Sequence, residues 1–418
     1  MLNKYIYPSQ RQAIQAFSFL DFSFRFLFLL VLPIFFFSNI NAQIAVGAEK
    51  MNEYLPLLKN KKVSLVVNQT SMVKGSHLVD TLLKRKVKLI NIFAPEHGFR
   101  GDHSAGEKVK SGIDATTKLQ IISLYGKNKK PTEAQLAKCD VVIFDIQDVG
   151  ARFYTYISTL HYVMEACSES HKMLIILDRP NPNGYYVDGP ILDTAYRSFV
   201  GMHPVPIVHG LTIGEYAQMI NGERWLKDSL QCKLQIVKCD RYTHDQLYRL
   251  PIKPSPNLPT SEAIFLYPSL CLFEGTNVSL GRGTYKPFEC LGKPGNSIGD
   301  YNFIPMNMPG IAEKPPFQDT LCRGFLLSEY ANNLMYFDMK INLYWLIELY
   351  KVEKDKSTFF NLFFDKLAGT SKLRKQIVEG KSEEDIRQSW QEGLQKYNQI
   401  RKKYLLYRDF TGKPWIYE

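Results

Sequence analysis

The sequence predicts an α/β protein: a Rossmann-like, mostly parallel sheet with helices on both faces, followed by a smaller C-terminal α+β domain. Three observations lead to this prediction: short apolar runs recur in the first half of the chain, amphipathic segments separate them, and the composition changes near residue 250. The chain has 418 residues, of which 45% are hydrophobic and 22% charged. This length and composition are sufficient for two ordinary globular domains.

The N-terminal segment has the pattern of a signal peptide. Arg25 precedes an apolar stretch, residues 26–37, and the polar residues 38–43 follow it. This stretch is shorter than the about 20 residues that a membrane-spanning helix needs, and the small Ala42 suits a cleavage site. We therefore expect residues 1–42 to be removed, which would leave a periplasmic or secreted protein with no stable membrane insertion. An uncleaved anchor is the alternative.

Five apolar runs predict the strands of the parallel sheet. They are residues 63–67, 87–93, 119–125, 141–144 and 174–177. Short runs of this kind, separated by longer segments, are typical of parallel strands that are buried on both faces. Between the last two runs, apolar residues recur with helical spacing from 153 to 167, which predicts a crossover helix. The expected catalytic domain covers residues 43–250.

A second domain is expected over residues 251–418. Its first part is rich in Pro, Gly and Asn, at residues 254–259, 274–277 and 281–284, and such loops suit hydrogen bonding to sugars. The tail from about Phe359 onward has a helical and charged pattern, with a helix start at residues 382–385.

Polar side chains follow four of the five predicted strands. They are Asn68 after the first, Glu96 and His97 after the second, Asp145, Asp148 and Arg152 after the fourth, and Asp178 and Arg179 after the fifth. Because ligands of open α/β sheets bind beyond the carboxyl ends of the strands, one rim should carry the site. The sequence has no GxGxxG after the first strand, no P-loop and no GxSxG motif, so we expect no cofactor and neither nucleotide nor serine hydrolase chemistry.

Glu96 is the leading candidate for a general acid. It lies between a proline that stiffens the turn and a glycine two residues later that allows close approach. A strand-end loop at a cleft can provide the partial burial that a catalytic carboxyl group needs. The alternative is a structural ion pair with Arg100. His97 and His103 could also join Glu96 or Asp102 around a metal, but their spacing matches no helical HExxH motif and we expect no metal.

Several carboxylates compete for the second catalytic role. Glu274 is the leading candidate, and Asp145 and Asp148 are the others. Glu215 lies three residues after Thr212, a spacing that favours a capping box over catalysis. Asp178 and Arg179 form either an internal ion pair or part of the substrate contact.

The charge distribution and the cysteine content argue against several functional classes and kinds of site. The net charge of +11 is spread along the chain without a basic and aromatic platform, so nucleic-acid binding is not expected. The 7 cysteines form no CxxC pair, which argues against a zinc site and a dense disulfide framework. We expect most of them to be small buried apolar groups.

Six segments in order, from residue 63 to the C-terminus, resemble the NamZ (YbbC-like) family of exo-β-N-acetylmuramidases. They are Asn-Gln-Thr at 68–70, Pro-Glu-His-Gly-Phe-Arg-Gly at 95–101, Asp-Ile-Gln-Asp-Val-Gly-Ala-Arg-Phe-Tyr-Thr-Tyr at 145–156, Asp-Arg-Pro-Asn-Pro at 178–182, Pro-Ser-Pro-Asn at 254–257 and Glu-Gly-Thr-Asn at 274–277. The resemblance implies release of N-acetylmuramic acid from the non-reducing ends of peptidoglycan fragments, in a cleft between the two domains. Peptidoglycan-derived glycans and muropeptides would be the partners.

Glycoside hydrolysis uses two carboxyl groups and no cofactor, which agrees with the residues above. The substrate acetamido group could replace one carboxylate, and the anomeric outcome stays open. Muramic acid carries a lactyl carboxylate, for which an arginine is the natural partner. The expected substrate-binding residues are Asn68, His97, Arg100, Arg152, Arg179, His209, Asn257 and Arg282. The alternatives are a non-catalytic muropeptide-binding protein and a metal-dependent amidase or deacetylase.

Overall fold

The computed structural model describes residues 44–99, 111–333 and 338–412. The expected signal peptide, residues 1–42, lies outside the described residues, as do Arg100, Asp102 and His103. In the part of the chain that is described, no helix combines the length and the apolar character needed to cross a membrane.

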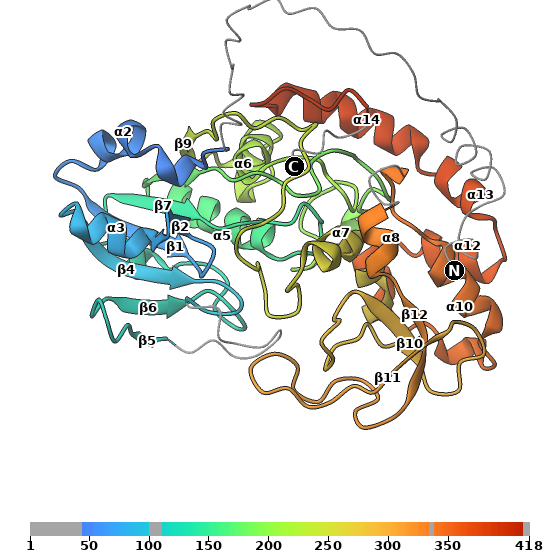
Figure 1. The fold of residues 1–418 in the computed structure, drawn as a ribbon. Coiled ribbons are helices and arrows are strands. Elements are labelled where there is room, and N and C mark those ends of the chain that lie inside the picture. The colour runs from blue at the N-terminus through green and yellow to red at the C-terminus, as the bar shows by residue number, and fades with distance from the viewer. Residues whose placement is uncertain (1–43, 100–110, 334–337, 413–418) are drawn as a thin grey trace, which may run out of the picture. The chain divides into compact units, whose positions relative to one another are not determined.

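A seven-stranded sheet forms the centre of the first half of the chain (Figure 1). Its strands are β1 (Lys62–Val67), β4 (Lys88–Ala94), β5 (Gly112–Ile113), β6 (Gln120–Ser123), β7 (Val141–Asp145), β8 (Met173–Leu177) and β9 (Lys233–Val237). They follow the order β5-β6-β4-β1-β7-β8-β9, and all neighbours are parallel except the pair of β5 with β6. The predicted Rossmann-like sheet is therefore confirmed.

The five predicted apolar runs correspond to β1, β4, β6, β7 and β8. The two edge strands, β5 and β9, were not predicted. β9 alternates exposed and half-buried residues up to its buried last residue, Val237, and β5 is a pair of exposed residues. An edge strand lacks a neighbour on one side and need not be apolar throughout, so a search for continuous apolar runs misses it.

Successive residues of the inner strands point to opposite faces of the sheet, where separate apolar clusters form. On β7, Val142 and Phe144 join the larger cluster, together with α5 (Tyr156–Glu169) and α6 (Ile213–Gly222). Val141 and Ile143 join the smaller cluster, together with α3 (Leu78–Lys84). Helices thus cover both faces, and α5 is the crossover helix that the spacing from 153 to 167 predicts.

The C-terminal part combines a small antiparallel sheet with short helices. Its strands are β10 (Cys290–Lys293), β11 (Tyr301–Phe303) and β12 (Cys322–Leu326), in the order β10-β12-β11. Its helices are α7 (Ser261–Leu270), α8 (Ser328–Asn333), α10 (Tyr344–Val352), α11 (Phe364–Ala368), α12 (Lys372–Val378), α13 (Glu383–Gln388) and α14 (Gln391–Arg401). The first half of the chain also contains the short elements α2 (Met51–Tyr54), β2 (Met72–Val73), β3 (Ser76–His77) and α4 (Glu133–Leu136). The predicted start of α13 is confirmed, because the Ser382 side chain accepts a hydrogen bond from the amide of Asp385.

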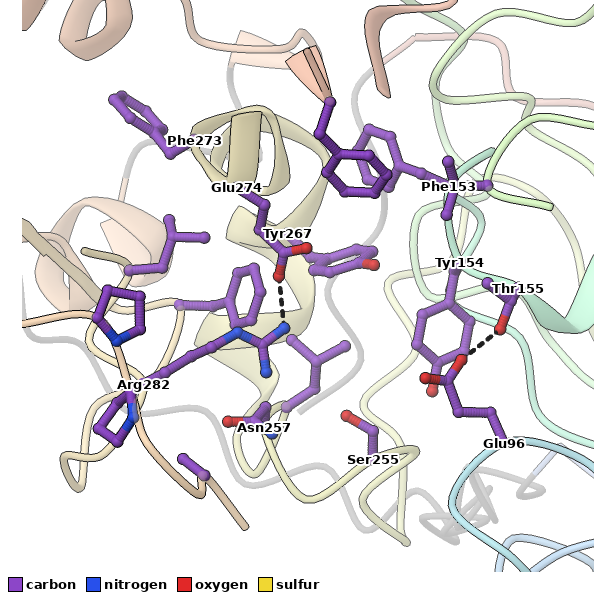
Figure 2. A pocket seen from close by; sticks show the side chains of 18 of the residues that line it. Glu96, Phe153, Tyr154, Thr155, Ser255, Asn257, Tyr267, Phe273, Glu274 and Arg282 are labelled. Carbon is purple, nitrogen blue, oxygen red and sulfur yellow. Dashed lines mark hydrogen bonds and ion pairs between the residues drawn. The ribbon is translucent and has the colours of Figure 1, made fainter. Parts of the chain in front are cut away.

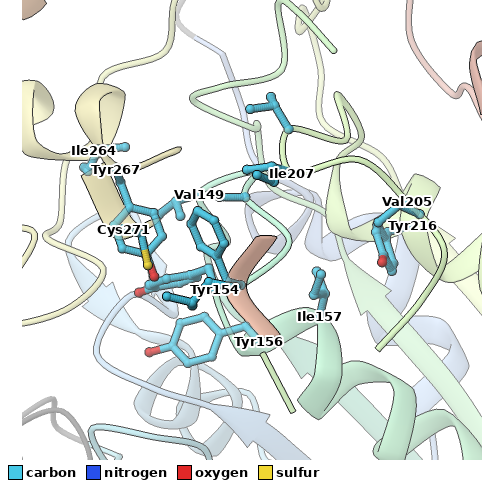
Figure 3. Packing of buried hydrophobic residues seen from close by; sticks show 14 of the residues in the cluster. Val149, Tyr154, Tyr156, Ile157, Val205, Ile207, Tyr216, Ile264, Tyr267 and Cys271 are labelled. Carbon is cyan, nitrogen blue, oxygen red and sulfur yellow. The ribbon is translucent and has the colours of Figure 1, made fainter. Parts of the chain in front are cut away.

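The larger apolar cluster continues from the sheet into the C-terminal part. Figure 3 shows Tyr154 and Tyr156 of the first half close to Tyr267 and Cys271 of the second. The rings of Tyr154 and Tyr267 meet edge to face with their centroids 5.7 Å apart. A shared core therefore fixes the two parts against each other at the place where the polar rim of the sheet lies. All seven cysteines are buried, which agrees with the expectation that most of them are small buried groups, and none of them forms a disulfide.

Candidate active site

A cavity of about 850 Å³ opens beyond the carboxyl end of β4. Glu96 and residues 153–156 line it from the first half of the chain. Glu274, Arg282 and residues 311–317 line it from the second half. Figure 2 shows Glu96 with Thr155 on one side of the pocket and Glu274 with Arg282 on the other. The pocket therefore lies at the predicted rim and draws on both halves of the chain.

A tight turn after β4 directs Glu96 into the pocket. His97 and Gly98 both have left-handed backbones, with φ of 69° and 79°, and the Gly98 amide donates to the Pro95 carbonyl at 3.1 Å. The Thr155 hydroxyl donates to Oε2 of Glu96 at 2.8 Å, and the Tyr125 hydroxyl forms a further hydrogen bond with the carboxylate. These two contacts orient the Glu96 side chain.

Asn68 lies behind the lining residue Tyr156 and forms a hydrogen bond with it. Its Nδ2 donates to the Tyr156 hydroxyl at 2.9 Å, and its Oδ1 accepts from the amide and the hydroxyl of Thr70 at 3.0 and 2.6 Å. Burial raises the pKa of Tyr156, which keeps its hydroxyl neutral. Asn68 is fully buried and does not line the pocket, so it positions Tyr156, which does.

Glu274 and Arg282 form an ion pair on the opposite side. Nη2 of Arg282 lies 2.5 Å from Oε1 of Glu274. Burial lowers the pKa of Arg282, but the charge and hydrogen bond of Glu274 outweigh it and raise the pKa above its usual value. The flanking glycines are required here, since both have positive φ and a Cβ on Gly281 would lie 2.5 Å from Sγ of Cys290. Glu274 and Arg282 thus reach the pocket as predicted, but as partners.

Asn257 also lines the pocket. Its Nδ2 donates to the Ile311 carbonyl at 2.8 Å, which fixes the orientation of the amide. Its Oδ1 is buried and has no hydrogen-bond partner among the described residues. A buried acceptor without a partner costs free energy, so this oxygen is suited to accept a hydrogen bond from a ligand.

Asp145 and Arg179 lie away from the pocket, in a buried ion pair. Nε and Nη2 of Arg179 donate to the two carboxylate oxygens of Asp145 at 2.6 and 3.0 Å. Arg179 therefore pairs with Asp145 and not with Asp178. The Asp178 carboxylate instead accepts hydrogen bonds from the Thr212 and Tyr407 hydroxyls at 2.7 and 2.6 Å. These groups connect the strand ends to each other and to the C-terminal segment.

Asp148 and His209 face each other in the interior, and neither lines the pocket. Oδ2 of Asp148 accepts from the Gly150 amide at 2.7 Å and lies 3.7 Å from Nε2 of His209. Nδ1 of His209 accepts from the Leu211 amide at 3.2 Å. This arrangement fixes the loop that follows β7 and holds both side chains out of the cavity.

Arg152 is fully buried, and among the described residues its side chain donates hydrogen bonds to backbone carbonyls alone. Nη1 donates to Pro190 and Val205 at 2.8 and 2.7 Å, and Nη2 donates to Leu367 and Ala368 at 2.9 and 2.7 Å. The last two carbonyls are at the C-terminal end of α11, where helix carbonyls lack partners within the helix. Arg152 thus joins the two halves of the chain and does not line the pocket.

Glu215 is a structural residue, as its spacing from Thr212 predicts. The two residues form a complete capping box at the start of α6. The carboxylate also contacts Nε2 of His244 at 3.0 Å, and both side chains are fully buried. Charge neutralisation by His244 and hydrogen bonds outweigh burial, which acts in the opposite direction, and so lower the pKa of Glu215.

Sequence reasoning missed Tyr125, Thr155 and Lys314 as pocket residues. Tyr125 ends the third apolar run, where it resembled a core residue, and Thr155 lies within the predicted crossover helix, at a position outside its apolar stripe. Thr155 could have been found, because it belongs to the polar segment 145–156 after β7. Lys314 had no signal in the sequence. Within the described ranges, no three His, Cys, Asp or Glu side chains gather as a metal site would require.

Glu96 and Glu274 both line this pocket, and two carboxyl groups at one cleft are the arrangement that most glycoside hydrolases use. A family model described as exo-beta-N-acetylmuramidase NamZ, N-terminal, matches residues 63–262, and its C-terminal counterpart matches residues 265–407. The chain belongs to this family, which confirms the resemblance seen in the sequence.

Similar proteins and solved structures cover most of the chain. The chain is 41% identical over 376 residues to the peptidoglycan beta-N-acetylmuramidase NamZ of Bacillus subtilis (strain 168), covering 85% of this chain and 89% of the relative. Two crystal structures of DUF1343 family proteins from Bacteroides fragilis NCTC 9343 share the fold. The first has a TM-score of 0.82 at 48% identity and covers 88% of this chain and 100% of its own. The second has a TM-score of 0.70 at 29% identity and covers 87% and 99%.

Proposed function

We propose that this protein is an exo-β-N-acetylmuramidase that removes terminal, non-reducing N-acetylmuramic acid from peptidoglycan fragments. The observation that carries this proposal is the pair of carboxylates, Glu96 and Glu274, on opposite sides of one pocket in a chain of the NamZ family.

Glu96 is the proposed general acid. Its carboxyl group would give a proton to the oxygen of the leaving sugar as the glycosidic bond breaks. Thr155 and Tyr125 orient it for this transfer, since each contacts the carboxylate through a hydroxyl group. The Thr155 hydroxyl donates its hydrogen bond to Oε2 of Glu96 and not to Oε1.

Glu274 is the proposed second carboxylate. Arg282 stands beside it and stabilises a negative charge there, which suits a group that assists water or supports an oxocarbenium-like transition state. Asp145 is neutralised by Arg179, and Asp148 points into the interior, so neither is proposed for this role. The acetamido group of the substrate remains an alternative nucleophile, in which case Glu274 would orient that group.

Conservative amide variants test these roles. With a chromogenic N-acetylmuraminide, Glu96→Gln should lower kcat by about a hundredfold to ten-thousandfold, as expected for loss of a general acid. Glu274→Gln should also lower kcat, whereas Glu215→Gln, which lies outside the pocket, should affect stability and leave KM unchanged. An active Glu96→Gln variant would refute the acid assignment. Absence of hydrolysis by the wild-type protein would favour the binding-protein alternative.

We further propose that the protein is exported, to the periplasm or outside the cell. The support is the charged, apolar and small-residue pattern around residues 25–43, together with the peptidoglycan named for the B. subtilis relative. Mass spectrometry of the protein recovered from its native compartment should find an N-terminus at Gln43. A full-length chain in the cytoplasm would contradict this proposal.

A further inference from the structure

The pocket contains two permanent positive charges among its described lining residues, Arg282 and Lys314. The charge of Arg282 is compensated, because Glu274 lies 2.5 Å from its guanidinium. Lys314 is exposed, and no described residue forms an ion pair with its ammonium group. Lys314 is therefore the uncompensated cation on this side of the pocket, although the exposed Glu313 also lines it.

Lys314 belongs to a loop, residues 305–319. Two hydrogen bonds connect this loop to segments at the pocket. The Met306 amide donates to the Gly283 carbonyl at 2.8 Å, directly after Arg282. The Asn257 side chain donates to the Ile311 carbonyl at 2.8 Å, three residues before Lys314. The loop that presents the ammonium group is thus tied to Asn257, which lines the pocket, and to Gly283, which follows the lining residue Arg282.

The loop also closes on itself. Met308 and Ala312 exchange backbone hydrogen bonds of 3.0 and 2.8 Å, and the Asp319 amide donates to the Pro305 carbonyl at 2.8 Å. Lys314 has a left-handed backbone with φ of 51°, a conformation that lysine rarely adopts and that persists only where the surroundings impose it. A loop held in this way presents Lys314 to the pocket from a defined backbone position.

We infer that Lys314 binds the lactyl carboxylate of muramic acid and so distinguishes this sugar from N-acetylglucosamine. This inference rests on the proposed function, since it names the part of the proposed substrate that Lys314 recognises. N-acetylglucosamine has a neutral hydroxyl where muramic acid carries the anionic lactyl ether. A cation that lines the pocket therefore favours binding of muramic acid over N-acetylglucosamine. Arg152 and Arg179, which the sequence suggested for this role, are buried away from the pocket.

The test compares N-acetylmuramic acid with its methyl ester, which keeps the shape and removes the charge. Calorimetry with the wild-type protein should show about two- to fivefold tighter binding of the acid, the range expected for an exposed ion pair. Lys314→Met should abolish this preference, and Lys314→Arg should retain most of it. Glu313→Gln is the matched control, because it removes the neighbouring negative charge and should leave the preference intact or increase it.

Kinetics separate this inference from the proposed function. Lys314→Met should raise KM for a chromogenic N-acetylmuraminide about two- to fivefold and leave kcat nearly unchanged, with an unaltered thermal midpoint. A protein that binds the acid through Lys314 but hydrolyses no muraminide would refute the proposed function alone. An unchanged preference in Lys314→Met, a wild-type protein that binds neither ligand, or loss of the preference only in Arg100→Met would each overturn the inference.

Discussion

Replacement of Arg152 by methionine would show whether this residue stabilises the fold or contacts the substrate, as the sequence suggested. The guanidinium donates four hydrogen bonds to carbonyls of both halves of the chain, and its side chain is fully buried. At about 1 kcal/mol net for each bond, Arg152→Met should lower the free energy of unfolding by about 4 kcal/mol. Over the unit Gln43–Glu418, an unfolding entropy of about 2.1 cal/mol/K per residue amounts to about 0.8 kcal/mol/K, so Tm should fall by about 5 °C.

Differential scanning calorimetry measures this shift, and steady-state kinetics on an N-acetylmuraminide supply the second readout. Because Arg152 does not line the pocket, the folded variant should keep the wild-type KM. Arg152→Lys is the control and should give an intermediate Tm, since a single ammonium cannot match the fork of a guanidinium. A tenfold rise in KM with an unchanged Tm would refute the structural role and restore Arg152 as a substrate-binding residue.

Three further predictions follow from the same contacts. Thr155→Val removes the hydroxyl that orients Glu96 and should lower kcat about tenfold with little change in KM; an unchanged kcat would show that Tyr125 alone suffices. Burial lowers the pKa of His161 to about 4 and that of His203 below its usual value, so the unfolded chain binds more protons between about pH 4 and 6.5. Stability should therefore fall with decreasing pH in this window, by up to about 1.4 kcal/mol per pH unit for each histidine, and urea unfolding of His161→Gln should show a shallower dependence. The seven buried thiols should resist a thiol reagent in the native protein and react in urea, and a disulfide found by mass spectrometry would contradict this.

The inner strands could be predicted from the sequence because a parallel strand buried on both faces must be apolar along its whole length. The runs that became β1, β4, β6, β7 and β8 satisfy this requirement. The N-terminal caps of two helices could also be predicted, since a cap depends on residues three positions apart in the sequence. Thr212 with Glu215 and the helix start at Ser382 are both formed as the spacing predicts.

The position of the pocket could also be predicted, and so could Glu96, Glu274, Asn257 and Arg282 as residues that line it. The carboxyl ends of parallel strands meet at one edge, so polar residues after several strands indicate a common rim. Strong local turn signals support Glu96 in particular: a proline before it and a glycine after it.

Only the tertiary structure decided which polar residues of this rim face the pocket. Asp145 and Arg179 follow different strands, 34 positions apart in sequence, yet meet in a buried ion pair. The partners of Arg152 lie up to 216 positions away, and the sequence carries no local sign of them. Lys314 enters the pocket because its loop is bonded to Gly283 and Asn257. Local spacing determines secondary structure and turns, whereas the direction of a side chain depends on distant chain segments that compete for its hydrogen bonds.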